Sequence, residues 1–327
     1  MTTPSSPLRI VVMGTGPFAV PMLRALSASR HPVAALVTQP VRESRGKAAP
    51  ISPMREAAAA LGIPIESPES INTDEARSRL MELGPDLLVV ADYGQILKPE
   101  TLGVARLGGI NLHGSLLPKY RGAAPINWAL WNGDAETGVT VIQMSPRVDA
   151  GGCLAWARTA IEPNENAVEL EHRLAELGAP LVVEIVEQLA AGTITPAPQD
   201  PAAATPARRL RKSDGEIDWS RGALQIKNQI RALEPWPRTS TSWLRAGGEP
   251  LRLILGRVEV VDLTSGADAP VTEPGTIAAV SKDSFTVATG DGVLVIRELQ
   301  PAGKRSLAAA EFLRGYPLRP GDRLGPG

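Results

Sequence analysis

The chain has 327 residues, of which 34 are Lys or Arg, 35 are Asp or Glu, and 43% are hydrophobic. At roughly 150 residues per domain, this length favours two domains, and the composition is that of a folded chain rather than a disordered one. The single cysteine, Cys153, excludes an internal disulfide. No stretch approaches the roughly 18 apolar residues of a membrane span. Because residues 1–7 also lack the basic-then-apolar order of a signal peptide, we expect a cytoplasmic protein.

The near-zero net charge conceals an asymmetry along the chain. Residues 1–200 contain 16 basic and 21 acidic residues, whereas residues 201–327 contain 18 basic and 14 acidic ones. A basic second half is compatible with a polyanionic partner. It is equally compatible with a chance imbalance of surface charges, and the count leaves both interpretations open.

Apolar segments that alternate with helical patterns dominate the first 190 residues. The predicted strands are residues 8–13, 32–37, 86–91, 109–113, 138–144 and 153–161, and the predicted helices are residues 17–29, a segment after Pro53, and 167–190. This alternation predicts an α/β domain over residues 1–190, with a mainly parallel sheet that helices cover on both faces.

The pattern changes near residue 191. Residues 191–206 are rich in Pro, Ala and Thr, as linkers often are, and we place the linker at residues 191–212. Short β-like segments divided by glycine-containing turns follow, at residues 251–261, 275–280, 285–288 and 293–298. They predict a smaller β-barrel over residues 213–327 rather than a second α/β unit.

Two common kinds of site are disfavoured by the sequence. The motif Gly14-x-Gly16-x-x-Ala19 follows a strand and opens a helix, as in dinucleotide-binding proteins. The second strand, however, ends without the acidic residue that holds a ribose, so a tight turn without a cofactor is favoured. The three histidines are far apart in sequence and Cys153 has no cysteine partner, so no metal site is predicted.

The most informative segment begins with polar residues at the end of strand 109–113. Strand alternation places Asn111 and His113 on one face, at the carboxyl end of the strand, where open α/β sheets bind ligands. A polar loop punctuated by Gly and Pro follows. Asp149, shortly before two glycines, either forms a plain turn or brings a carboxylate beside an imidazole. Spacing alone leaves both interpretations of Asp149 open.

These segments resemble the formyltransferases that use 10-formyltetrahydrofolate. The resemblance is carried by Asn111-Leu112-His113-Gly114-Ser115-Leu116-Leu117-Pro118, by Arg121-Gly122-Ala123-Ala124-Pro125, and by Asp149 with the glycines after it. It extends to residues 38–40, 133–140, 217–219, 235–237, 290–292 and 299–304, so nearly the whole chain is covered. The C-terminal matches are those of the members that act on initiator methionyl-tRNA rather than of their single-domain relatives.

The resemblance implies a Rossmann-like catalytic domain, an OB-like β-barrel that helps to hold tRNA, and 10-formyltetrahydrofolate as the formyl donor. It places Asn111, His113 and Asp149 at the family's catalytic positions. The family's folate-binding loop corresponds to Ser115, Leu116, Leu117 and Pro118. Asp92 departs from the pattern, because it stands near the pteridine pocket where the family has a small residue.

The chemistry of the residues agrees with this implied activity. Formyl transfer to an amine passes through a tetrahedral oxyanion, which needs hydrogen-bond donors, and it needs a group that moves a proton from the amine to the leaving nitrogen. We therefore assign oxyanion stabilisation to Asn111 and His113, and orientation of His113 together with proton relay to Asp149. No covalent intermediate and no metal are required.

Basic residues are expected to contact the tRNA phosphates. Arg42, Arg45 and Lys47 belong to the loop over residues 39–53, and the loop arginine of the family corresponds to Arg42. A second basic run covers residues 208–212, for which a solvated linker is an equally good interpretation. We expect a monomer.

Two other functions share parts of this pattern. A formyltransferase that acts on another amine, such as an amino sugar or a small ribonucleotide, would not need a basic barrel. A non-catalytic RNA-binding protein on a decayed enzyme scaffold would not need Asn111, His113 and Asp149, which are all present.

Overall fold

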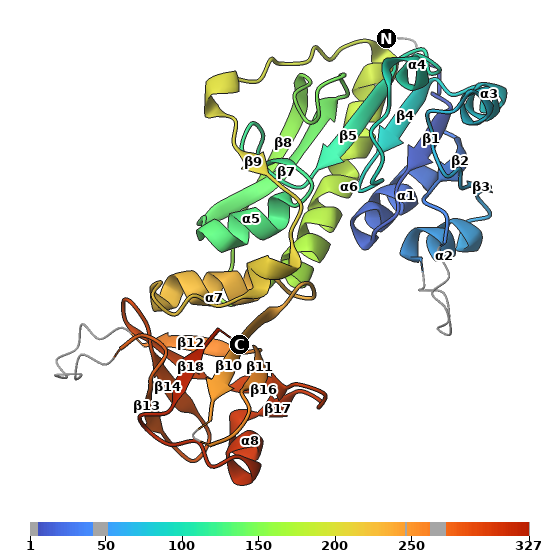
Figure 1. Cartoon of the computed structure of the whole chain (residues 1–327). Coiled ribbons are helices and arrows are strands. Elements are labelled where there is room, and N and C mark those ends of the chain that lie inside the picture. The colour runs from blue at the N-terminus through green and yellow to red at the C-terminus, as the bar shows by residue number, and fades with distance from the viewer. Residues whose placement is uncertain (1–5, 42–51, 246, 262–272, 327) are drawn as a thin grey trace. The chain divides into compact units, whose positions relative to one another are not determined.

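The computed structural model describes residues 6–41, 52–245, 247–261 and 273–326 (Figure 1). They divide into two compact units. The first contains Met1–Ile126, Ala135–Ile161 and Glu169–Arg208, and the second Asn127–Asp134, Glu162–Val168 and Arg209–Gly327, apart from the residues outside the described ranges. Most of the segment predicted as a linker therefore belongs to the first unit.

A seven-stranded sheet of order β3-β2-β1-β4-β5-β7-β8 organises the first unit. Its strands are β1 (Ile10–Met13), β2 (Val33–Val37), β3 (Ile65–Glu66), β4 (Leu87–Val90), β5 (Gly109–His113), β7 (Glu136–Gln143) and β8 (Cys153–Ala160). The first five are parallel, and β7 and β8 run antiparallel to their neighbours. The predicted α/β class with a mainly parallel sheet is confirmed.

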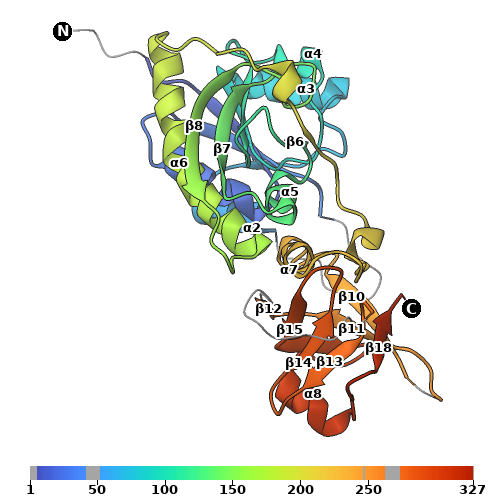
Figure 2. The ribbon, with the colours of Figure 1, turned by 90° about the vertical axis from the view of Figure 1, so that its left-hand side faces the viewer.

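Helices cover both faces of this sheet, as the continuous burial of β1 and β4 requires. The helical elements up to residue 203 are η1 (Pro17–Ala19), α1 (Val20–Ser27), α2 (Pro53–Ala60), α3 (Asp74–Leu83), α4 (Pro99–Leu102), α5 (Pro125–Asn132), α6 (Ala167–Ala191) and η2 (Pro201–Ala203). On one face, Leu88 of β4 packs with Leu80 of α3 and Leu102 of α4. On the other, α6 approaches β5 so closely that a Cβ at Gly178 would lie 2.8 Å from Leu112 (Figures 1 and 2).

The register of the sheet decides which face carries the polar residues of β5. Asn111 lies opposite Val90 of β4, and Val90 belongs to the same core cluster as α3 and α4. Leu112 points to the α6 face. Because side chains alternate along a strand, Asn111 and His113 lie on the face covered by α3 and α4.

The second unit consists mainly of antiparallel strands (Figure 2). Its sheets have the orders β17-β16-β11-β10-β18 and β12-β15-β14-β13. The strands are β10 (Thr239–Leu244), β11 (Leu251–Leu255), β12 (Val258–Val261), β13 (Ile277–Val280), β14 (Phe285–Ala288), β15 (Val293–Ile296), β16 (Glu298–Pro301), β17 (Leu307–Ala308) and β18 (Arg323–Gly325), and the helical elements are η3 (Lys212–Gly215), α7 (Ala223–Ala232) and α8 (Ala309–Gly315). A bridge between Thr276 and Arg323 joins the two sheets.

Buried side chains of the described residues of this second unit form a hydrophobic core. Phe285 of β14 and Phe312 of α8 are completely buried within it, with ring centroids 6.3 Å apart. The smaller C-terminal domain of antiparallel strands agrees with the fold class predicted for residues 213–327. Within the described ranges, no helix has both the length and the apolar composition needed to cross a membrane.

Candidate active site

The carboxyl end of β5 presents the two polar residues that the sequence singles out. Asn111 lies between Val90 of β4 and Ile142 of β7, and His113 lies opposite Thr140 of β7. His113 is buried, with 5% of its surface exposed, whereas Asn111 is half-buried. In the part of the chain that the structure describes, the side-chain amide of Asn111 has no hydrogen-bond partner, so it is available to a ligand.

The imidazole of His113 faces an oxygen atom on each side. Its Nε2 lies 2.9 Å from the carbonyl oxygen of Tyr120, and its Nδ1 lies 3.6 Å from Oδ2 of Asp149. A carbonyl only accepts hydrogen bonds, so Nε2 is the donor in the first contact. The second distance is too long for a direct hydrogen bond, so Nδ1 remains open to a ligand or a water molecule while the carboxylate stays close.

Asp149 is held in position through both its backbone and its side chain. Its φ of 50° is in the left-handed region, which is uncommon for a residue with a side chain. The backbone N–H of Gly122 donates to Oδ2 of Asp149 over 2.9 Å, and the side chain is 13% exposed. The structure thus brings His113 and Asp149 together, which the spacing in the sequence left open.

A pocket of about 150 Å³ connects Asn111 with Asp149. Its remaining walls come from the loop after β4, including Tyr93 and Leu97, and from the end of β7 and the turn after it, including Ile142 and Met144. Apolar walls with a few convergent polar groups are typical of sites for small ligands. The Asn111 amide and the Asp149 carboxylate supply those polar groups.

The loop after His113 is stabilised from within. Thr140, which is fully buried, accepts a hydrogen bond from the backbone N–H of Leu117 (3.0 Å) and donates to the carbonyl oxygen of Ser115 (2.6 Å). The hydroxyl of Ser115 donates to the carbonyl oxygen of Lys119 (2.7 Å). None of the four predicted folate-binding residues, Ser115 to Pro118, lines the pocket beside Asn111.

Comparison with known proteins places this site in a family. Residues 8–186 match the formyl transferase family, and residues 209–317 match the formyl transferase C-terminal domain. This chain belongs to the formyltransferase family. Methionyl-tRNA formyltransferase of Roseiflexus castenholzii is 43% identical over 97% of this chain and 99% of its own length, and that of Rhodopirellula baltica is 43% identical over 97% and 96%.

A solved structure agrees with the fold of this formyltransferase. The N-formyltransferase of Helicobacter canadensis, in complex with folinic acid and dTDP-3-aminofucose, superposes with a TM-score of 0.63. The match covers 88% of this chain and 98% of that one at 16% identity. At this identity the likeness supports the fold alone.

In this formyltransferase, the motif Gly14-x-Gly16-x-x-Ala19 forms a turn, and the carboxylate of Asp92 lies against it. The backbone N–H of Gly16 donates to the carboxylate of Asp92, and a Cβ at Gly16 would collide with that carboxylate. In a dinucleotide-binding turn, such amides bind a phosphate. Here the carboxylate of Asp92 accepts a hydrogen bond from the backbone N–H of Gly16. This contact supports the interpretation of a turn without a dinucleotide.

Asp92 and Glu171 form an acidic pair beside this turn. Glu171 of α6 accepts a hydrogen bond from the backbone N–H of Phe18, two residues after Gly16. Although solvent reaches Asp92, the surrounding protein atoms raise the pKa of its carboxyl group to about 6. Burial and the charge of Asp92 together raise the pKa of Glu171 to about 7.

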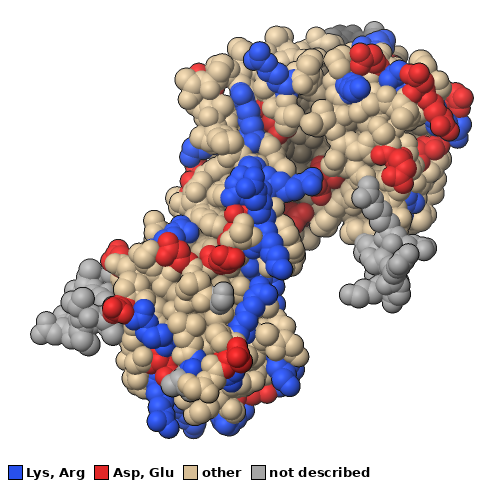
Figure 3. Space-filling view, in the orientation of Figure 1, with Lys and Arg blue, Asp and Glu red and all other residues tan. Residues whose placement is uncertain are grey.

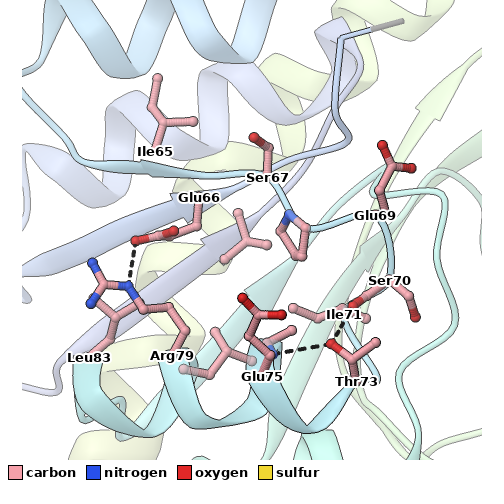
Figure 4. Close-up of a pocket in the computed structure, with 14 residues that line it drawn as sticks. Ile65, Glu66, Ser67, Glu69, Ser70, Ile71, Thr73, Glu75, Arg79 and Leu83 are labelled. Atoms are coloured by element: carbon pink, nitrogen blue, oxygen red, sulfur yellow. Dashed lines mark hydrogen bonds and ion pairs between the residues drawn. The ribbon is translucent and has the colours of Figure 1, made fainter.

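A larger cavity of about 560 Å³ lies elsewhere on the first unit (Figure 4). Its walls come from β3, the segment after it and α3, and its rim carries Glu69, Glu75 and the ion pair between Glu66 and Arg79, in which Nε and Oε1 are 3.0 Å apart. Asn111, His113 and Asp149 are not among its lining residues. It is therefore separate from the candidate active site.

Arg42, Arg45 and Lys47 lie outside the described residues. Among the residues within the described ranges, no three His, Cys, Asp or Glu side chains are grouped so that they could hold a metal ion.

Sequence reasoning missed several residues of the site. The pocket residues Tyr93 to Leu97 follow a parallel strand at the same sheet edge as Asn111, and that position was a usable signal. Thr140 and Gln199 had no such signal, since their importance depends on contacts made 23 and 50 residues away in the chain.

Proposed function

We propose that this formyltransferase transfers the formyl group of 10-formyltetrahydrofolate to the α-amino group of methionine on initiator methionyl-tRNA. The product, N-formylmethionyl-tRNA, serves translation initiation. Curated methionyl-tRNA formyltransferases are 43% identical to the chain over nearly its full length, and both formyl transferase domains are present. The observation in the structure that carries the proposal is the unpartnered Asn111 amide in a pocket shared with Asp149, beside buried His113.

Asn111 and His113 stabilise the oxyanion. The amine attacks the formyl carbon, a new C–N bond forms, and the carbonyl oxygen takes up negative charge until the bond to N10 breaks. The free amide of Asn111 donates to that oxygen, and Nδ1 of His113 is the second donor when the ring is protonated. One such donor typically stabilises a transition state by roughly 3–4 kcal/mol.

Asp149 serves the proton balance of the reaction. The amine loses a proton as it bonds to carbon, and N10 gains one as it leaves. The carboxylate of Asp149, 3.6 Å from the imidazole of His113, relays a proton directly or through water. General acid–base catalysis of this kind typically contributes 10²- to 10⁴-fold in rate.

We assign tRNA binding to basic residues of both parts of the chain. Arg42, Arg45 and Lys47 are the proposed contacts in the catalytic part, which we place at residues 1–190. The part proposed for tRNA binding, residues 213–327, follows the basic run 208–212. Lys and Arg side chains gather at the lower end of the second unit in Figure 3. We further propose that the enzyme acts as a cytoplasmic monomer and that Ser115 to Pro118 contact the folate.

The acceptor substrate is tested with the full-length enzyme and one formyl donor. Methionyl-tRNA, a nucleotide-linked amino sugar and an amino ribonucleotide are offered separately, and formylated product is measured for each. We expect efficient turnover with methionyl-tRNA alone. Preferential formylation of a small amine would replace tRNA as the substrate, and tRNA binding without turnover of any acceptor would favour a non-catalytic RNA-binding protein.

A further inference from the structure

The segment predicted as a linker takes part in building the site. Residues 196–207, here called the strap, belong to the first unit. Ala197 exchanges two backbone hydrogen bonds with Cys153 of β8, 2.7 and 2.8 Å long. Farther along the strap, β9 (Pro206–Ala207) pairs in parallel with β6 (Arg121–Gly122). The strap therefore contacts both the strand that follows the Asp149 turn and the loop that follows His113.

Gln199 lies between these two contacts of the strap. Both the nitrogen and the oxygen of its side-chain amide form hydrogen bonds. Its Nε2 donates to the carbonyl oxygens of Asp149 (2.8 Å) and Gly151 (2.7 Å). Its Oε1 accepts from Nε (3.1 Å) and Nη2 (2.7 Å) of Arg121. The paired donation from the guanidinium fixes which end of the amide is oxygen, so the NH₂ group must face the Asp149 turn.

These contacts connect Asp149, Gln199 and the Arg121–Gly122 segment in a closed circuit of bonds that includes the Asp149 carboxylate. Gly122, next to Arg121 in sequence, donates its backbone N–H to Oδ2 of Asp149. Gln199 thus holds the backbone of Asp149 and, through Arg121, the loop that holds its side chain. Residue 149 has a φ of 50°, a conformation that a non-glycine residue keeps only when its surroundings enforce it.

We propose that Gln199 is a positioning residue that fixes the carboxylate of Asp149 beside the imidazole of His113. The inference rests on the catalytic role proposed for Asp149. It assigns to the strap a direct part in the reaction: this segment completes the catalytic arrangement in addition to connecting two parts of the chain. Because Gln199 acts through Asp149, its effect is on the chemical step.

The test substitutes Gln199→Glu in the full-length enzyme. Glutamate has the same shape and keeps the contact with Arg121, but it has no hydrogen to donate to the carbonyl oxygens of Asp149 and Gly151. We expect kcat to fall at least tenfold, with the KM values for methionyl-tRNA and the formyl donor changed less than threefold. Asp200→Asn is the matched control, because the neighbouring carboxylate of Asp200 is exposed and accepts from the backbone N–H of Ala202, and kcat should stay unchanged.

A double-mutant cycle separates positioning from a merely structural role. If Gln199 acts through Asp149, Gln199→Glu lowers kcat in the parent enzyme and has no further effect in the Asp149→Asn background. Additive losses, or a lower melting temperature with unchanged kcat, would overturn the inference. Full activity of Asp149→Asn alone would instead overturn the proposed role of Asp149, so the two failures are distinguishable.

Discussion

Oδ2 of Asp149 lies 3.6 Å from Nδ1 of His113 and, in the same arrangement, accepts the backbone N–H of Gly122 over 2.9 Å. The carboxylate is thus anchored by the backbone rather than by the imidazole. It lies beside the ring without using up the hydrogen-bonding capacity of Nδ1. This arrangement suits a reaction in which that nitrogen serves the substrate.

The first prediction concerns the charge of Asp149. Asp149→Asn keeps an oxygen that accepts from Gly122 but removes the negative charge beside His113. We expect kcat to fall at least ~10²-fold, because proton relay and stabilisation of the imidazolium are both lost. The free energy of unfolding, measured with urea, should change little. Near-normal kcat in the purified variant would remove Asp149 from the mechanism.

The second prediction concerns Thr140, whose hydroxyl bridges the two ends of the Ser115–Leu117 segment. Thr140→Val keeps the shape of the side chain but leaves a buried N–H and a buried carbonyl without this partner. Such a loss costs about 1–3 kcal/mol in the free energy of unfolding. Because the segment adjoins His113, we also expect kcat/KM to fall. Thr140→Ser retains the hydroxyl and should recover most of both quantities; equal losses in the two variants would contradict this explanation.

The third prediction uses the raised pKa values of Asp92 and Glu171, about 6 and about 7. In the unfolded chain these groups titrate near pH 4, so between pH 4 and 7 the folded state binds more protons. The pair therefore contributes stability in acid that is lost as the pH rises through the folded pKa values. Asp92→Asn and Glu171→Gln should each raise the melting temperature relative to the parent, and more at pH 8 than at pH 5.

The control for this pH dependence is Glu176→Gln, a substitution of an exposed glutamate on the same helix. Both test substitutions keep an oxygen that can accept from Gly16 or Phe18, so the hydrogen bonds remain. If the difference in melting temperature between variant and parent does not vary with pH, the pKa values of Asp92 and Glu171 are not raised by their surroundings in the folded protein.

Periodic patterns in the sequence predicted the parts of the fold that depend on burial. The parallel strands β1, β2, β4 and β5 and the long helix α6 were predicted close to their observed bounds, because apolar runs and helical periodicity reflect packing directly. The parallel strand β3 was not predicted, since two half-buried residues leave no such pattern. Strand alternation also placed Asn111 and His113 on one face correctly, and the register with β4 and β7 agrees.

The rest of the site depends on contacts between irregular segments. The 3.6 Å approach of Asp149 to His113 needs the left-handed turn at residue 149, which no periodicity encodes. The strap has the Pro- and Ala-rich composition of a linker, yet Gln199 bonds to residues 48 to 78 positions away. The composition of the strap indicates the conformation that it favours in isolation. Its hydrogen bonds depend instead on the strand and the loop that pack against it in the folded protein.

The fourth prediction is electrostatic. If several Lys and Arg side chains contact tRNA phosphates, each contact releases counterions, and the apparent KM for methionyl-tRNA rises steeply between low and physiological salt. The KM for the formyl donor should change much less, because counterion release scales with the number of phosphates contacted and the donor is not a polyanion. Steady-state kinetics over a salt series tests this directly. A flat response for tRNA would contradict the proposed basic contacts.

The fifth prediction concerns Arg42, which we propose to contact the tRNA and which lies outside the described residues. A guanidinium grips a phosphate through two hydrogen bonds or stacks on a base, and losing a hydrogen bond to a charged group costs about 1.5–3 kcal/mol. Arg42→Ala should therefore lower kcat/KM for methionyl-tRNA by roughly tenfold or more. Arg42→Lys should restore only part of the lost kcat/KM, since the positive charge remains but the planar guanidinium with its paired donors is lost. Thermal stability and the KM for the formyl donor should match those of the parent enzyme. If Arg42→Ala leaves kcat/KM for tRNA unchanged, this arginine makes no productive contact with the acceptor.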